Sequence, residues 1–213
     1  MRLARRGASS KAAQKDQATE KAEALFEEYK DPSDDNIGPE GVERLCSDLR
    51  IDPSSRKVLL LAWKMGASRM GYFSKQEFTT GIKLLNATSL DKLRKVLPKL
   101  DQDVDQNEDA FSAFFAFAFK FCLMEPQQKI LDIETAVQML HVVLPEGNEH
   151  LEPFSRFLKD QTEYKYMNLD QWTSFYRFSE EVGVDCSNYD EGHAWPLLLD
   201  NYVEWLSERR SKS

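Results

Sequence analysis

The segment FSAFFAFAFKF, residues 111–121, decides the fold class, because its pattern fits both a strand and a helix. Four phenylalanines alternate along it, as on one face of a strand: Phe115, Phe117, Phe119 and Phe121. A second set recurs at helical spacing: Phe111, Phe114, Ala118 and Phe121. The segment is long, its interleaved residues are mostly alanine, and its neighbours are helical. We therefore expect a helix that is buried on most sides.

Five helices are expected before this segment, because apolar residues recur there at helical spacing. Their signals are the apolar stripes at 18–29 and 42–49 and the start residues Asp52, Ser74 and Ser89. Asp52 should cap the third helix, with Pro53 at its first position. Ser74 and Glu77 have the spacing of a capping box. Pro98 should kink or end the fifth helix.

Further helices are expected after the phenylalanine-rich segment. Their predicted ranges are 132–144, 149–160, 169–182 and 196–208. Asn168 and Gln171 form a second capping pair, and Pro196 should begin the last helix. The whole pattern predicts an all-α fold.

The chain of 213 residues is long enough to bury one core or two. Two closely packed helical lobes are expected, at 19–105 and 106–208, between a flexible basic tail at 1–18 and a short tail at 209–213. Buried free thiols are expected for the three cysteines, which lie far apart without metal-ligand spacing: Cys46, Cys122 and Cys186. No apolar run reaches the length of a membrane span.

The net charge of −8 argues against a nucleic-acid partner, which requires a basic surface. The first two dozen residues are rich in Lys and Arg, so the predicted folded part is more acidic than the total. An acidic surface suits a basic partner, although a solvated acidic surface without a partner is also common.

Two segments resemble EF-hand calcium loops, and neither is intact. In residues 101–112 the acids fit the first positions, but Gln106 replaces the glycine of the turn and Ser112 replaces the final glutamate. In residues 66–77 the glycine and the glutamate are present, but the first, third and fifth positions are Gly66, Ser68 and Met70. The first lobe is therefore expected to contain degenerate EF-hand-like helix–loop–helix units that bind no metal. A calcium-regulated helical adaptor is the alternative function.

No catalytic motif is found, and neither a cofactor nor a catalytic residue is expected. The sequence lacks a GxSxG motif, a phosphate-binding glycine loop and a zinc-binding HExxH motif. Asp190, Glu191 and His193 lie within four residues and leave a hydrolase as a third hypothesis, although a loop histidine is the simpler interpretation.

Several motifs together resemble the potentiating-neddylation domain of the defective-in-cullin-neddylation family. They are YKDPSDDNIGPEG (29–41), LLLAWKM (59–65), FSKQEF (73–78), MNLDQW (167–172) and SNYDEGHAWPLLLDNYVEW (187–205). The resemblance implies a non-catalytic scaffold that holds a cullin winged-helix domain and the N-terminally acetylated neddylation conjugating enzyme together. With the cullin's RING subunit, the scaffold would speed transfer of the ubiquitin-like modifier to the cullin. A monomer in the nucleus, the cytoplasm or both is expected.

The resemblance also assigns two binding sites. The cullin-binding residues would be Asp170, Ala194 and Asp200, which offer two carboxylates and a small side chain to a basic partner. The pocket for the acetylated methionine would be lined by Val42, Val58, Leu61, Met65, Phe73, Phe121 and Val142. From the residues alone, each of these seven could equally be part of the core.

Overall fold

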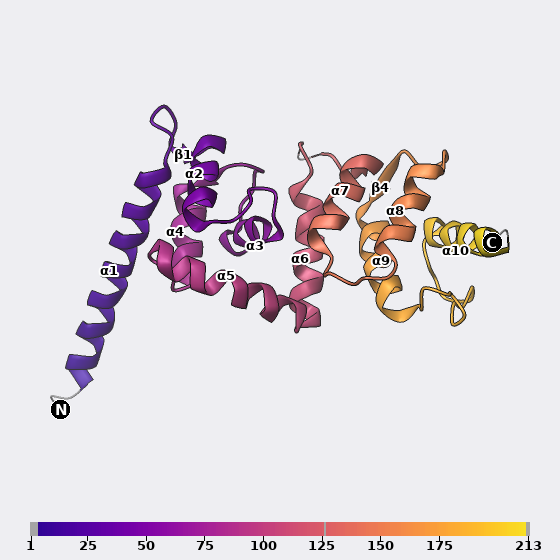
Figure 1. Ribbon diagram of the computed structural model, residues 1–213. Helices are drawn as coiled ribbons and strands as arrows, with labels where there is room; N and C mark the ends of the chain where they lie inside the picture. Colours follow the sequence, from indigo (N-terminus) through magenta and orange to yellow (C-terminus); the bar gives the residue numbers. More distant parts are fainter. Residues whose placement is uncertain (1–3, 126, 212–213) are drawn as a thin grey trace. The chain divides into compact units, whose positions relative to one another are not determined.

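The computed structural model describes residues 4–125 and 127–211, with side chains from residue 16 onward. Within these ranges it contains ten helices and two short two-stranded sheets, which confirms the all-α prediction (Figure 1). The chain divides after Gln106 into two compact units. No helix of the described part is long and apolar enough to cross a membrane.

The first unit contains five helices and one sheet among its described residues. Its elements are α1 (Ala4–Tyr29), β1 (Asn36–Ile37), α2 (Pro39–Leu49), α3 (Arg56–Met65), β2 (Phe73–Ser74), α4 (Lys75–Leu84) and α5 (Leu90–Asp105). Strands β1 and β2 are antiparallel, with Ile37 opposite Phe73. The strands therefore join the loop between α1 and α2 to the loop between α3 and α4.

The helices of the first unit approach one another at glycines. A Cβ atom on Gly81 of α4 would lie 2.7 Å from the Cα atom of Met65 in α3. A Cβ atom on Gly41 of α2 would lie 2.2 Å from the carbonyl oxygen of Tyr29 in α1. Only glycine allows backbones to lie this close, so these two residues set the packing of four helices.

One predicted helix start in the first unit is wrong, and of the two effects predicted for Pro98 the end of the helix does not occur. Helix α3 begins at Arg56 after Ser55, because Asp52 accepts a hydrogen bond from the Ser54 backbone (2.7 Å) in a turn before the helix. Helix α5 does not end at Pro98. It continues into the acidic segment and ends at Asp105. Buried leucines and valine on one face of α5 outweigh the hydrogen bond that proline removes.

Residues 101–105, the start of the first segment that resembles a calcium loop, are therefore helical. The Arg56 guanidinium pairs with the carboxylates of Asp101 (3.0 Å) and Asp105 across the helices. In the other segment, the Glu77 carboxylate accepts hydrogen bonds from the backbones of Ser68 (2.8 Å) and Ser74 (2.7 Å). Burial raises the pKa of Glu77, but these bonds outweigh it and lower the pKa below its usual value. Donors from the protein thus pair with Asp101 and Asp105 of the first segment and with Glu77 of the second.

Both ends of the fold are longer than predicted. Helix α1 begins at Ala4, within the segment that was expected to be a flexible tail, and α10 continues to Ser211. The remainder of the two predicted tails, residues 1–3 and 212–213, lies outside the described residues. Arg209 is part of α10 and pairs with Asp160 (2.7 Å), so the end of this helix belongs to the packed unit.

The second unit repeats the arrangement of the first, which the sequence did not indicate. Its elements are α6 (Glu108–Phe121), β3 (Ile130–Asp132), α7 (Ile133–Val143), α8 (Leu151–Asp160), β4 (Tyr166–Asn168), α9 (Leu169–Glu181) and α10 (Leu197–Ser211). Strands β3 and β4 are antiparallel, with Leu131 opposite Met167. They join the α6–α7 loop to the α8–α9 loop, and α10 follows as an additional helix. Each unit thus contains two helix–loop–helix pairs joined by a short ribbon.

The phenylalanine-rich segment is the helix α6, as predicted. One face of α6 is buried, including Phe115, whose ring stacks on Trp172 of α9 at a centroid distance of 4.6 Å. The Trp172 indole also donates a hydrogen bond to the Phe115 carbonyl (2.8 Å). Phe117 and Phe121 stack on each other at 5.0 Å and are only half-buried. Phe117 and Phe121 therefore lie outside the fully buried face of the helix, which contains Phe111, Phe114, Phe115 and Phe119.

Candidate functional site

The three predicted docking residues lie in the second unit. Asp170 is exposed in the first turn of α9, which starts as predicted because Asn168 and Gln171 form a capping box. Ala194 is exposed at the end of the loop before α10. Asp200 is half-buried in the first turn of α10.

The loop at 182–196 is shaped by its own polar side chains. The Asn188 side chain accepts a hydrogen bond from the Gly183 backbone (2.9 Å) and donates one to the Glu181 carbonyl (2.8 Å). Asp185 accepts from the backbone and the hydroxyl of Ser187 (3.1 and 3.0 Å). These short-range bonds fold the loop into consecutive turns, so its shape is encoded locally.

The trio of Asp190, Glu191 and His193 forms part of these turns. Asp190 accepts a hydrogen bond from the Gly192 backbone (2.8 Å) and lies 3.1 Å from the Nδ1 atom of His193. The side chains of Asp190 and His193 are 64% and 62% exposed, so the pair lies in solvent. Its contacts define the turn before Ala194 and include no nucleophile.

One serine–histidine contact is present in this unit, in a position that does not suit catalysis. The Ser155 hydroxyl lies 3.1 Å from the Nε2 atom of His141, and Glu152 lies 3.7 Å from its Nδ1 atom. Ser155 is only 3% exposed within α8, so a substrate cannot reach its hydroxyl. The contact therefore serves the packing of α7 against α8.

Aromatic contacts attach the loop to the helices. The Trp195 ring packs on Phe178 at a centroid distance of 5.5 Å. The Arg177 guanidinium lies over the Trp195 ring, 4.2 Å from its centroid. Both Phe178 and Arg177 belong to α9, so Trp195 fixes the end of the loop on this helix. Ala194, which precedes it, is held at the surface.

Buried His150 and exposed Arg210 connect the start of the loop to α10. The Nε2 atom of His150 donates to the Val182 carbonyl (2.9 Å), and its Nδ1 atom accepts from the Tyr202 hydroxyl (3.0 Å). Burial lowers the pKa of His150, which keeps the ring neutral for this role. The Arg210 guanidinium donates to the carbonyls of Val184 and Asp185. The loop is thus tied to both ends of α10.

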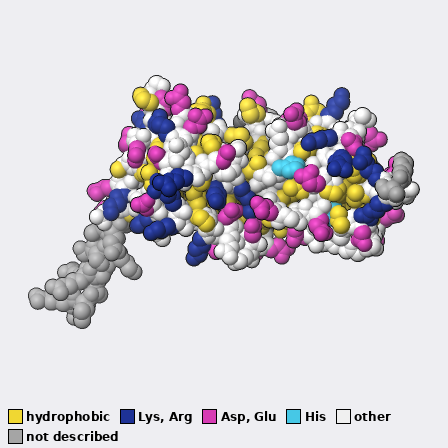
Figure 2. Space-filling model, in the orientation of Figure 1, with side chains coloured by type: hydrophobic (Ala, Val, Ile, Leu, Met, Phe, Trp, Pro, Cys, Tyr) yellow, Lys and Arg dark blue, Asp and Glu magenta, His cyan; other side chains and the backbone are white. Residues whose placement is uncertain are grey.

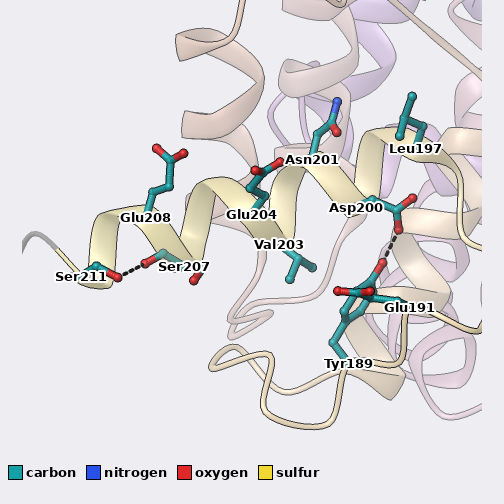
Figure 3. Close-up of a pocket in the computed structure, with 10 residues that line it drawn as sticks. All are labelled: Tyr189, Glu191, Leu197, Asp200, Asn201, Val203, Glu204, Ser207, Glu208 and Ser211. Atoms are coloured by element: carbon teal, nitrogen blue, oxygen red, sulfur yellow. Dashed lines mark hydrogen bonds between the residues drawn. The ribbon is translucent and has the colours of Figure 1, made fainter.

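A groove along α10 contains Asp200 (Figure 3). Its volume is ≈ 1030 Å³, and four carboxylates line it: Glu191, Asp200, Glu204 and Glu208. The other residues that line it are Tyr189, Leu197, Asn201, Val203, Ser207 and Ser211, so it contains no Lys or Arg. Figure 2 shows acidic and basic side chains interspersed over the face in view, whereas every charged residue that lines this groove is acidic.

Two tyrosines hold polar residues of the groove, and no sequence pattern indicates either contact. The Tyr189 hydroxyl donates to the Asp200 carboxylate. The Tyr164 hydroxyl accepts from the Asn201 side chain (2.8 Å). Both pairs are distant in sequence, and spacing along the chain cannot predict such contacts.

Asp170 does not line this groove. It lies in a separate depression of ≈ 380 Å³, together with Thr173, Arg177, Glu180 and other residues of α6 and α9. Arg177 connects this depression to the loop before α10, since it lines the depression and also packs on Trp195. Asp170 and Asp200 thus belong to one unit but line two different depressions, and Ala194 lines neither.

The seven residues predicted for the acetyl-methionine pocket divide between the units. Leu61, Met65 and Phe73 are nearly fully buried in the first unit, where Phe73 contacts Phe78 at a centroid distance of 6.2 Å. Val42 is 9% exposed and Val58 is half-buried in the same unit, while Phe121 and Val142 are half-buried in the second. Val42, Leu61, Met65 and Phe73, four of the seven, therefore take part in the core of the first unit.

Comparison with known proteins identifies the family. A sequence model described as "Cullin binding" matches residues 92–205, more than half of the chain. The chain belongs to this cullin-binding family. The match includes Asp170, Ala194 and Asp200, and also Phe121 and Val142, whereas the other five residues assigned to the pocket precede it.

Curated relatives of this chain are DCN1-like proteins. DCN1-like protein 2 of Dictyostelium discoideum is 43% identical over 177 residues, which are 83% of the chain and 66% of the relative. Human DCN1-like protein 4 is 39% identical over 178 residues, 84% of the chain and 60% of the relative. Human DCN1-like protein 3 is 38% identical over 209 residues, 97% of the chain and 68% of the relative. The chain thus spans slightly less than two thirds of the first two. The predicted family is confirmed.

Proposed function

We propose that this chain binds a cullin through the surface formed by the α10 groove and the loop before it. The observation that carries the proposal is the position of Asp200 in a groove whose charged lining residues are all acidic, within the region matched by the cullin-binding family. Carboxylates form strong charge-assisted hydrogen bonds with Lys and Arg side chains. Exposed Ala194 allows a partner to approach the backbone closely, and Asp170 adds a second acid on α9.

We further propose that the bound cullin is held beside the neddylation conjugating enzyme. The docking residues would contact the winged-helix domain of the cullin, while an apolar pocket would receive the acetylated N-terminus of the conjugating enzyme. With the cullin's RING subunit in the assembly, the chain would raise the effective concentration of the enzyme at the cullin lysine. Such a scaffold requires no nucleophile of its own.

The direct test measures binding and transfer with the same preparation. The chain should bind an isolated cullin winged-helix fragment in calorimetry, and it should accelerate modification of the full cullin–RING complex in single-turnover reactions. Absence of binding to the fragment would remove the proposal. Binding without acceleration would leave cullin docking in place and contradict the scaffold function.

The proposed pocket predicts selectivity for an acetylated peptide. A peptide with the N-terminal sequence of the conjugating enzyme should bind at least tenfold more tightly when acetylated. A free ammonium group would lose roughly several kcal/mol of hydration free energy in an apolar pocket. Acetylation removes this charge and therefore this cost. Fluorescence anisotropy of the two labelled peptides provides the measurement, and an acetylated peptide of scrambled sequence is the control. Equal affinity of the acetylated and free peptides would contradict the pocket assignment.

A further inference from the structure

The Asp200 carboxylate is held by a second residue of the groove. Its Oδ1 atom accepts a hydrogen bond from the hydroxyl of Tyr189, 11 residues earlier in the chain (Figure 3). Tyr189 is half-buried and comes from the loop, whereas Asp200 comes from α10. The bond therefore joins the two elements that form the proposed cullin-binding surface.

Tyr189 is fixed in this position by its own contacts. Its ring packs on Phe178 of α9 at a centroid distance of 6.0 Å. Its backbone N–H donates to the Cys186 carbonyl (3.1 Å), and Asn188 beside it is bonded to the end of α9. The hydroxyl is thus presented to Asp200 from a framework that α9 and the loop turns determine.

The bond leaves Asp200 able to receive a partner. The Oδ1 atom accepts from Tyr189, and Oδ2 has no partner in the described part of the structure and lies in the acidic groove. Burial is the main cause that raises the pKa of Tyr189 above its usual value, and the hydrogen bond to Asp200 is the second cause. The hydroxyl of Tyr189 therefore remains a donor at neutral pH. An aspartate fixed in one rotamer loses less conformational entropy when a basic side chain binds it.

We propose that Tyr189 is a positioning residue for cullin docking, which orients the Asp200 carboxylate toward a Lys or Arg side chain of the cullin. The proposal rests on the function proposed above. Tyr189 contacts Asp200 and shapes the groove, and its contribution to affinity acts through Asp200.

Replacing Tyr189 with phenylalanine tests this role, because the change removes only the hydroxyl. Affinity for the cullin winged-helix fragment should fall by about tenfold, the lower end of the effect of one hydrogen bond to a charged group. Tyr29→Phe is the matched control, since the Tyr29 hydroxyl donates a similar bond to Asp48 (2.7 Å) in the first unit. Tyr29→Phe should bind the fragment like the unmodified chain. Unchanged or tighter binding by Tyr189→Phe would overturn the proposal.

A double-mutant cycle separates positioning from a general structural effect. In an Asp200→Ala background, Tyr189→Phe should have no further effect on affinity, because the group that it positions is absent. An equal loss in both backgrounds would overturn the proposed action through Asp200. If Asp200→Ala alone binds normally, the docking surface itself is wrong. If Asp200→Ala fails to bind and Tyr189→Phe binds normally, only the role of Tyr189 is wrong.

Discussion

Replacing Asp200 with lysine is expected to weaken binding of a cullin winged-helix fragment by at least about 100-fold. The substitution removes an acceptor for a basic partner and places a positive charge where the partner's own positive charge would lie. It also removes the acceptor of the Tyr189 hydroxyl, so the loop and α10 lose a bond that joins them. Calorimetry with the purified fragment measures the change.

Glu149→Lys is the matched control for this charge reversal. Glu149 is exposed in the same unit and lines neither depression, so the net charge changes equally without altering the docking surface. This variant should bind nearly as the unmodified chain does. Asp170→Lys shows whether the depression on α9 contributes as well. If the folded Asp200→Lys and Glu149→Lys proteins bind equally well, Asp200 has no role in docking.

Replacing Trp172 with alanine is expected to lower the free energy of unfolding of the second unit by about 3–5 kcal/mol. Trp172 is 0% exposed and stacks on Phe115, so the substitution leaves a large apolar cavity between α6 and α9. The hydrogen bond from its indole to the Phe115 carbonyl is also lost. Chemical denaturation followed by circular dichroism measures the loss.

Trp205→Ala is the comparison for this core substitution. Trp205 is half-buried in α10 and contacts Phe157 at a centroid distance of 5.9 Å, so its loss removes less packing. The expected effect is smaller than that of Trp172→Ala. If the two alanine variants are equally stable, Trp172 does not hold α6 and α9 together as the geometry indicates.

Local signals in the sequence predicted most of the fold. The capping pairs at Ser74 and Asn168 were correct because each pair satisfies backbone groups within one helical turn. The start of α3 was wrong because Asp52 can cap a helix or close a turn, and both use the same local bonds. The continuation of α5 past Pro98 depends on tertiary burial, which a local rule for proline does not contain.

The docking residues were named only because the family resemblance carried them over, and their role stays a prediction. Asp200 lines the groove, and Ala194 is exposed at the end of the loop before α10. The bond between Tyr189 and Asp200 could not be predicted, because it depends on how the loop folds back on α10. The separate depression around Asp170 likewise follows from the packing of α6 against α9. Sequence spacing does not determine such three-dimensional relations.

The attachment of Arg210 to the loop has a consequence for where this binding module ends. The family's sequence pattern stops at residue 205, but Arg210 holds the carbonyls of Val184 and Asp185 from five residues further on. A protein shortened at residue 205 would keep Asp170, Ala194 and Asp200 while losing both this clamp on the loop and the Glu208 end of the groove. A modification of Arg210 alone would release the clamp and alter affinity without a change in these three residues.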